Sequence, residues 1–437
     1  RQRQMCIRDR YNRRPKKIKR NPEIFIEKRP ENIISASNKG HKMVLKKYDM
    51  GLISVTAMGI GSVVGAGIFA LLGEVILQAG NLSYYAFIIA GIAAMFSGYS
   101  YAKLSGKYPD SGGLTDYFKI AFKSRAVSGT FTLIYYITSF VSISMLAKSF
   151  GIYACKFLHD AAMEPVCVNY FASGIIIALA ILNMMGADKV GNAETLMVAF
   201  KFFVLLSLIA GAFIELDVRS DKVDFMPTPT AFLGSIGITF FAYAGYGIIT
   251  NAAADVKNPK FTIAAAIYLT IIIVALLYTS LAYIILKYIP EADLTANADT
   301  AITIAAEKLF GKWGYGIMFA AAIIAFISGI SATYFSVFRI SYALAEQKIM
   351  PKIYHKRFWE HGTYGNALSV AVLTLATIYF DFNSIVNLAS GAYLVSYLAV
   401  FAASWVLRRE TGASPVLILL GSALMVFILV MFLANIY

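Results

Sequence analysis

The chain has 437 residues, of which 58% are hydrophobic and only 15% are charged, whereas a typical soluble domain has about 25% charged residues. This composition excludes a soluble globular fold, because so much apolar surface needs lipid around it. The net charge of +14 does not indicate nucleic acid as a partner, since Lys and Arg are concentrated between Arg1 and Lys47.

The chain opens with a polar, basic segment, residues 1–47. Its composition is too polar for a folded domain, so we predict a cytoplasmic tail that is disordered or binds lipid headgroups. The opening RQRQMCIRDR is unlike its surroundings and begins with Arg1 rather than Met. We treat it as a candidate sequencing scar and leave it out of the fold prediction.

Apolar runs separated by short polar turns occupy the rest of the chain. A membrane-crossing helix needs about 20 apolar residues, and about eleven runs have a suitable length. The predicted spans are 49–78, 82–105, 127–155, 170–186, 192–215, 231–254, 262–288, 313–345, 366–382, 384–407 and 414–436. The fold class is therefore all-α, a polytopic membrane protein whose remaining residues are loop or tail. Because the sequence stops right after the last run, a missing twelfth span is an open alternative.

Basic residues sort the loops into two sets. Lys and Arg gather after the second, fourth, sixth, eighth and tenth spans, whereas acidic residues dilute them in the alternate loops. Short loops rich in Lys and Arg stay in the cytoplasm. The sequence thus predicts a protein of the plasma (inner) membrane with a cytoplasmic N-terminus.

The cysteines and histidines show no metal-ligand spacing. Cys155 and Cys167 fall on the same outer face in this topology, so a disulfide is an open alternative, but we favour free thiols. All four histidines lie outside the predicted spans. We expect no metal site and no cofactor.

The first span, DMGLISVTAMGIGSVVGAGIFALLGEVILQ, has Gly59, Gly61, Gly65 and Gly67 at its middle. Each glycine costs a helix about 1 kcal/mol relative to Ala, so this clustering favours a local break. Close helix packing is the alternative, because Gly61 and Gly65 also fit the small-residue contact motif of membrane helices. For an isolated span, packing is the preferred interpretation.

The sixth span, TPTAFLGSIGITFFAYAGYGIITNAAADVKNP, is interrupted in the same way at Gly245 and Gly247. Matching breaks predict two inverted five-helix repeats, 49–215 and 231–407, within a core of residues 48–409, with 410–437 as an additional helix. An unwound helix frees amides that attract a carboxylate and carbonyls that accept from an ammonium group. A zwitterionic amino acid offers both groups.

Four motifs resemble the amino acid-polyamine-organocation permeases, which share the fold of the bacterial leucine transporter. They are GIGSVVGAGIF in the first span, YPDSGGLTDY at 108–117, FFAYAGYGIITNAAADVKNPK at 240–260 and SVFRISYALAEQKIMPK at 336–352. The resemblance covers nearly everything from Asp49 to Arg409. It implies an amino acid transporter whose substrate binds at the two breaks.

Carried onto this sequence, the resemblance implies a role for each group at the breaks. The substrate carboxylate would bind the amides of Gly65, Ala66 and Gly67. The substrate ammonium group would bind the carbonyls of Val63, Phe241 and Ala244. The candidates for an aromatic gate are Phe241, Tyr243 and Tyr246. Simple core packing is an equally open alternative for the two tyrosines.

Lys201 lies well inside the fifth span, where a charge is costly and therefore indicates function. It is about nine residues from the start of the span, or about 13 Å, which is close to the middle of the hydrocarbon core. The resemblance implies that a lysine here occupies the place of a sodium ion between the first, fifth and eighth spans. Snorkelling to the surface is the alternative, and we favour proton coupling.

Other charges within the spans have plainer interpretations. Lys103 and Lys148 lie near span ends and can snorkel. Glu74 is a second candidate for proton handling, although a structural role is favoured there. The chain also departs from the family, because Gly247 stands where many members have a glutamate. This departure shifts the coupling role to Lys201 and leaves ion-independent exchange open.

We therefore expect a proton-coupled amino acid importer that works by alternating access and is not an enzyme. The expected partners are the amino acid substrate, protons and membrane lipid, with no nucleic acid. The breaks carry no acidic residue, which favours neutral substrates. An ion-independent amino acid exchanger and, less favoured, a non-transporting amino acid sensor are the alternatives.

Overall fold

Helices make up nearly all of the computed structural model, which describes residues 50–64, 67–109, 113–158, 165–185, 190–214, 225–256, 258–359 and 362–436. Nine helical stretches in these ranges are long and apolar enough to cross a membrane, and two shorter apolar helices, Leu52–Val63 and Tyr364–Tyr379, accompany them. The predicted class, an all-α polytopic membrane protein, is confirmed. The predicted tail, 1–47, lies outside the described residues.

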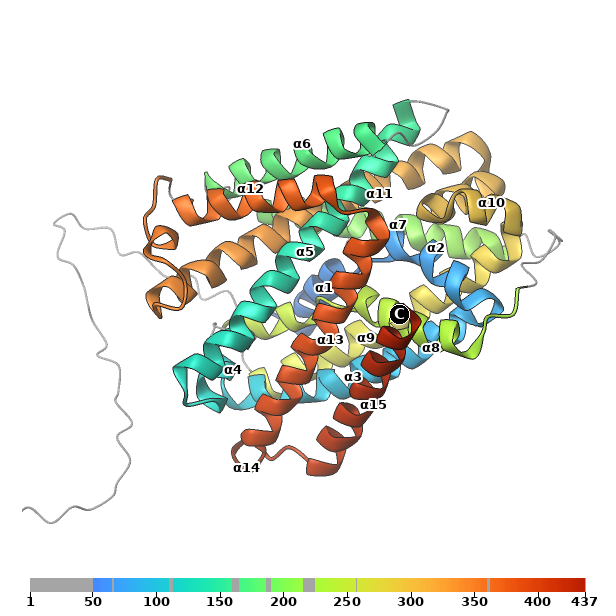
Figure 1. Ribbon diagram of the computed structural model, residues 1–437. Helices are drawn as coiled ribbons and strands as arrows, with labels where there is room; N and C mark the ends of the chain where they lie inside the picture. The colour runs from blue at the N-terminus through green and yellow to red at the C-terminus, as the bar shows by residue number, and fades with distance from the viewer. Residues whose placement is uncertain are drawn as a thin grey trace, which may run out of the picture. The chain divides into compact units, whose positions relative to one another are not determined.

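The helices follow the predicted spans in chain order (Figure 1). The undivided ones are α3 (Ser83–Lys107), α5 (Arg125–Leu158), α6 (Pro165–Met184), α7 (Val190–Ile214), α9 (Pro259–Tyr288), α11 (Ala301–Glu346), α12 (Tyr364–Tyr379), α13 (Phe382–Val406) and α15 (Pro415–Ile436). The first predicted span is divided into α1 (Leu52–Val63) and α2 (Gly67–Ala79). The sixth is divided into α8 (Pro229–Ala242) and a 3-10 helix, η2 (Tyr246–Asp255).

The expectation that everything between the spans is loop was wrong. Three short helices lie there, α4 (Gly113–Ala121), α10 (Glu291–Ala296) and α14 (Arg408–Thr411), with 3-10 turns η1 (Gly80–Leu82), η3 (Ala298–Thr300) and η4 (Lys352–Tyr354). The long α11 also begins well before its predicted span and is interrupted at Gly311, whose φ is 65°. These segments are too short or too polar to register as runs of about 20 apolar residues. α4 is stabilised instead by one buried face, which includes Leu114 and Phe118.

Polar residues begin several of the helices. The side chain of Thr228 accepts the amide of Ala231 at 3.2 Å at the start of α8. Asp381 does the same for the amide of Ser384 at 3.1 Å at the start of α13. Such caps satisfy amides that have no partner within the helix, and each stabilises its helix by about 1 kcal/mol.

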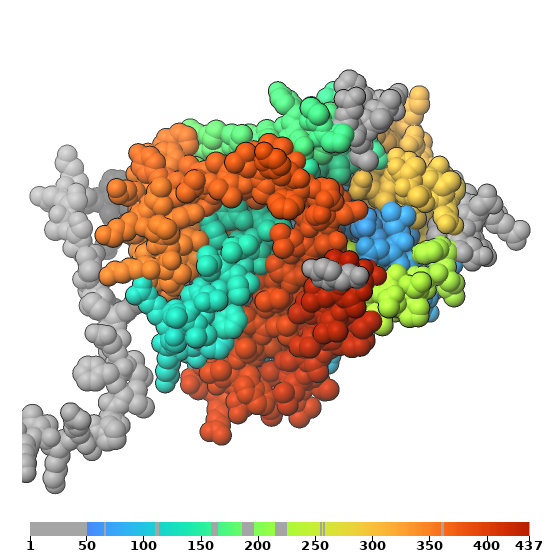
Figure 2. All heavy atoms as spheres, viewed as in Figure 1, coloured from blue at the N-terminus to red at the C-terminus, as the bar shows by residue number. Residues whose placement is uncertain are grey.

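The long helices pack in a few extended pairs. α3 lies along α9, and α5 contacts α6, α11 and α13. α15 contacts both α8 and α13, and Figure 2 shows α13 and α15 side by side on one face, in orange-red and dark red. The broken helices lie among these pairs, since α1 contacts α9 and η2, and α2 contacts α8.

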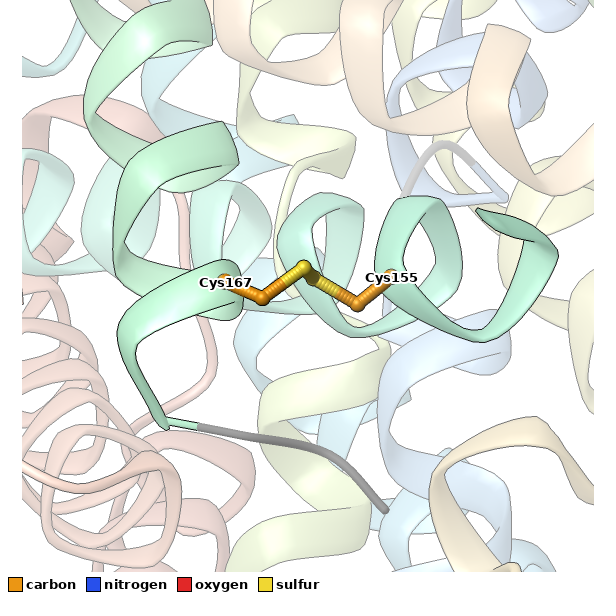
Figure 3. Close-up of a disulfide and its surroundings, with 2 residues drawn as sticks. All are labelled: Cys155 and Cys167. Carbon is orange, nitrogen blue, oxygen red and sulfur yellow. A yellow bond between two sulfur atoms is a disulfide. The ribbon is translucent and has the colours of Figure 1, made fainter. Parts of the chain in front are cut away.

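A disulfide joins Cys155, near the end of α5, to Cys167, near the start of α6 (Figure 3). The two Cα atoms are 6.1 Å apart, within the usual range for a disulfide. Our preference for free thiols was therefore wrong. The sequence places both cysteines at the same end of two neighbouring spans, but it does not reveal that the two helices pack with these residues facing each other.

Candidate functional site

The first break separates α1 from α2. α1 ends at Val63 and α2 begins at Gly67, while Gly65 and Ala66, two of the three predicted carboxylate-binding residues, lie outside the described residues. The last carbonyls of a helix and the first amides of the next have no partner within their own helices. The break therefore offers backbone groups of both polarities to a ligand.

Two of the four glycines in this span serve packing instead. Gly59 and Gly61 lie inside α1 and are buried. A Cβ at Gly59 would lie 2.4 Å from Cδ1 of Ile249, and one at Gly61 would lie 2.6 Å from Cγ2 of Val198. Close helix packing thus explains Gly59 and Gly61, whereas the helix break lies at the later glycines of the same span.

The second break is a turn after α8. Residues Tyr243 to Gly245 form the turn that joins Ala242 to η2. Gly245 has a φ of 124°, a region that L-residues with a side chain rarely adopt. The amide of Ala244 donates to the carbonyl of Phe241 at 2.9 Å. The amide of Tyr243 also donates to the carbonyl of Phe241, so this carbonyl is already engaged within the turn.

The two breaks face each other. The hydroxyl of Ser62, next to the end of α1, donates to the carbonyl of Gly245 at 3.2 Å. A Cβ at Gly67 would lie 3.0 Å from both the Cα and the carbonyl oxygen of Ala242. A side chain at position 67 would therefore push against the backbone at the end of α8, which would have to shift by a few tenths of an ångström. Val63, Gly67, Phe241 and Ala244 are brought into one region of the fold.

Tyr278 of α9 links the two breaks, and sequence reasoning missed it. Its hydroxyl donates to the carbonyl of Val63 at 3.0 Å and lies 3.4 Å from the carbonyl of Ala242. The side chain is fully buried. One lone pair of the Val63 carbonyl is thus already engaged, which leaves the other for a substrate. No signal in the sequence separates Tyr278 from the apolar run around it.

The three predicted gate residues have different surroundings. Phe241 packs against Tyr393 of α13, with ring centroids 5.0 Å apart. Tyr243 donates its hydroxyl to the carbonyl of Phe87 at 2.9 Å, away from the Ser62–Gly245 contact and toward α3. Tyr246 is hydrogen-bonded to Ser97 of α3. Both tyrosines are fully buried, which is the arrangement expected of core packing.

Tyrosine rings fill the space beside Gly247. A Cβ at Gly247 would lie 3.2 Å from ring atoms of Tyr101, a residue of α3. The Tyr101 ring also contacts Tyr246 and Tyr397, each with centroids 5.9 Å apart. A larger side chain at position 247 therefore requires this cluster of tyrosines to move. The position of the cluster could not be inferred from the sequence.

Lys201 lies on α7 and is 1% exposed. Its Nζ donates to the carbonyl of Gly61 in α1 at 2.9 Å and lies 3.4 Å from Oγ of Ser328 in α11. The side chain of Lys201 therefore does not snorkel to the membrane surface. The ammonium group connects three helices that correspond to the first, fifth and eighth predicted spans.

The other intramembrane charges lie elsewhere. Lys148 is only 7% exposed, and its Nζ bonds Oδ1 of Asn169 at 2.5 Å instead of reaching the surface. Glu74 of α2 accepts from Nε2 of Gln78 at 3.3 Å, one turn along the same helix. Within the described ranges, no group of three or more His, Cys, Asp or Glu side chains could hold a metal ion.

Comparison with known proteins places this arrangement in a family. Residues 50–437 match the family described as amino acid permease. The inner membrane transport protein YbaT of Escherichia coli strain K12 is 37% identical over 388 residues, which cover 89% of this chain and 90% of that protein. The branched-chain amino acid permease BcaP of Bacillus subtilis strain 168 is 24% identical over 358 residues, 78% of this chain and 75% of that protein. The methylthioribose transporter of the same species is 23% identical over 407 residues, 88% of this chain and 86% of that protein. This chain therefore belongs to the amino acid permeases of the amino acid-polyamine-organocation superfamily, and it is a multi-pass membrane transporter.

Proposed function

We propose that this permease imports neutral amino acids together with protons, by alternating access. The observation that carries the proposal is the position of Lys201. Its buried ammonium group reaches from α7 to the Gly61 carbonyl at 2.9 Å and to Ser328 at 3.4 Å. A single titratable group thus contacts the first broken helix and the long α11 at once.

Protonation of Lys201 changes how strongly these elements are held together. A charged donor makes a hydrogen bond roughly twice as strong as a neutral one. The ammonium form therefore holds the α1 segment that leads into the first break more strongly than the neutral amine does. A proton taken up on one side of the membrane and released on the other then biases which way the site opens.

The substrate is proposed to bind where the breaks face each other. Its carboxylate would bind the amides of Gly65, Ala66 and Gly67, and its ammonium group would bind the carbonyls of Val63, Phe241 and Ala244. The support is the close approach of Gly67 to Ala242 and of Ser62 to Gly245. Phe241, with Tyr393 beside it, is the favoured aromatic gate, ahead of Tyr243 and Tyr246.

One relative supports the proposed substrate class. BcaP is named a permease for branched-chain amino acids, which have neutral, apolar side chains. The methylthioribose transporter is named for a substrate that is not an amino acid, although it is similar over nearly the same length. The side chains around the breaks, rather than the family, therefore decide the substrate, and those described here are uncharged.

The disulfide supports the proposed orientation. Disulfides persist in oxidising compartments and are rare in the cytosol. The bond between Cys155 and Cys167 therefore favours an outer location for the connection between α5 and α6. With that connection outside, the N-terminus would be cytoplasmic. The name of the relative YbaT, an inner membrane transport protein, supports the plasma (inner) membrane as the location. The breaks in the first and sixth spans likewise favour two inverted repeats, 49–215 and 231–407.

The experiment is uptake of labelled amino acids by the purified protein in proteoliposomes. A panel of neutral, acidic and basic amino acids is offered with or without an inward proton gradient, and with or without sodium. We expect neutral amino acids alone to accumulate, only with the proton gradient and equally well without sodium. Uptake that ignores the gradient but requires internal amino acid would make the protein an exchanger and reject proton coupling.

A further inference from the structure

A pocket of about 440 Å³ lies apart from the two breaks, among the end of α3, the start of α9 and α14. Its polar lining consists mainly of Tyr99, Lys103, Lys107, Lys260, Tyr268 and Glu410. Figure 1 shows α14 at the end of the chain's last helical hairpin, and α14 contacts α3. None of the residues proposed to bind the amino acid or the proton lines this pocket.

The pocket exists because α3 and α9 approach closely at this end. Lys107 is the last residue of α3, and Lys260 is the second residue of α9. A Cβ at Gly106 would lie 3.3 Å from the Cα of Lys260. Glycine at 106 thus allows contact between the two backbones, and this contact places lysines from both helices on the wall of one hollow.

The side chains that line the pocket carry a net positive charge, which favours an anion as the ligand. Three lysines line it, against one carboxylate, Glu410. Oε2 of Glu410 accepts from the hydroxyl of Tyr108 at 2.6 Å. Burial, and then this bond to Glu410, raises the pKa of Tyr108 to about 12, so Tyr108 keeps its proton and continues to donate.

None of the three ammonium groups is paired with a carboxylate of the described residues. In the part of the chain that the structure describes, Lys103, Lys107 and Lys260 make no ion pair. Nζ of Lys103 lies 5.6 Å from the centre of the Tyr99 ring, a weak cation–π contact. A net excess of two positive charges therefore lines a concave site.

The surface that leads away from the pocket along α9 is apolar. Leu269, next to the pocket residue Tyr268, is 39% exposed, and Leu276 further along α9 is 66% exposed. In a membrane-spanning helix such residues face acyl chains. A ligand with a charged head and apolar chains would thus meet lysines in the pocket and exposed leucines further along α9.

We propose that this pocket binds a phosphate-bearing anion, with Lys103, Lys107 and Lys260 as its ligands. Clustered lysines at the end of membrane-spanning helices attract anionic lipid headgroups. A free phosphate offers the same charge and the same acceptor oxygens. The apolar surface of α9 favours the headgroup of an anionic phospholipid as the source.

The first test measures lipid binding to the purified protein by native mass spectrometry, with phosphatidylglycerol or phosphatidylcholine added. Each lysine that contacts the headgroup in the pocket is expected to contribute about fivefold in affinity, so the double variant Lys103→Gln, Lys260→Gln is expected to bind phosphatidylglycerol about 30-fold more weakly. The matched control is Lys352→Gln, Lys356→Gln, which removes two exposed lysines near η4 and is expected to bind as the wild type does. Equal losses in both variants, or no preference for phosphatidylglycerol, would overturn the proposal.

The second test separates the two sources of phosphate. Inorganic phosphate is titrated into delipidated protein while the melting temperature is recorded. A rise that Lys103→Gln, Lys260→Gln abolishes supports a free anion as the ligand, whereas lysine-dependent lipid binding with no response to phosphate supports the headgroup. The variant Lys103→Arg, Lys260→Arg keeps both charges and should restore binding. If it binds as weakly as the glutamine variant, charge does not hold the ligand and the proposal fails.

Discussion

Replacement of Tyr278 by phenylalanine tests whether one hydroxyl keeps the two breaks next to each other. The hydroxyl donates to the Val63 carbonyl at 3.0 Å, and the ring stays fully buried in the variant. Loss of a hydrogen bond costs about 1 kcal/mol, and a buried acceptor left with fewer partners adds about 1 kcal/mol more. Val63 ends α1, so no amide within its helix compensates for the lost bond.

We expect the lost hydrogen bond to lower the affinity for the substrate, because Val63 is also a proposed ligand of the substrate ammonium group. If about 1.4 kcal/mol of the cost is expressed in the bound state, affinity for the transported amino acid falls about tenfold. The assay is equilibrium binding of the labelled amino acid in detergent, with melting temperature measured in parallel.

Tyr334→Phe is the matched control. Tyr334 of α11 is equally buried and donates to a carbonyl, that of Ile176, at 3.2 Å. Ile176 lies inside α6, where the helix supplies a second donor, so we expect a loss of about 1 kcal/mol in stability and unchanged affinity. Equal effects of the two variants on affinity would refute a special role for Tyr278.

Three further predictions concern stability and are read from melting temperatures in detergent. Gly245→Ala should destabilise the protein by about 1–2 kcal/mol, because φ is 124° and the new Cβ would lie 2.9 Å from Oγ of Ser62. The control Gly174→Ala lies inside α6, where a Cβ meets nothing within 4 Å, and should be neutral or stabilising. Equal destabilisation by both variants would contradict a strained turn at Gly245. Asp381→Ala should cost about 1 kcal/mol of folding stability at neutral pH. Hydrogen bonds from Ser384 lower the pKa of Asp381, so the stability that the ionised side chain contributes is full above the ordinary carboxyl range and disappears as pH falls through the lowered pKa. A stability difference between wild type and variant that stays unchanged in acid would rule out the ionised cap. Cys155→Ser should cost about 3 kcal/mol under oxidising conditions and nothing after reduction. A wild-type protein whose melting temperature does not respond to reductant would contradict the disulfide.

The sequence sufficed for the membrane-spanning helices and for the location of the breaks, but not for the short helices between the spans. Apolar runs of the length of a membrane span have one stable form in lipid, so their positions follow from composition. The clusters at Gly59 to Gly67 and at Gly245 and Gly247 indicated the interruptions, because glycine is costly in an undisturbed helix. Gly245 then proved to have a φ of 124°, which requires glycine.

The sequence did not reveal which side chains from distant helices meet at the breaks. Tyr278 and Tyr393 lie in apolar runs, where a tyrosine is ordinary core filler. Their roles depend on the rotation of α9 and α13 about their axes, which is set by packing against neighbours and not by local pattern. The disulfide between Cys155 and Cys167 was misjudged for the same reason, since it depends on how α5 and α6 face each other.

The central claim is that Lys201 couples protons to transport, and gradient-driven accumulation by Lys201→Met tests it most directly. Lys148→Met is the control, because Lys148 is also buried and bonds only Asn169 among the contacts described. In proteoliposomes with an inward proton gradient, wild type and Lys148→Met are predicted to concentrate the labelled amino acid above its external level, whereas Lys201→Met only exchanges it. Concentrative uptake by Lys201→Met at the wild-type level would contradict the account.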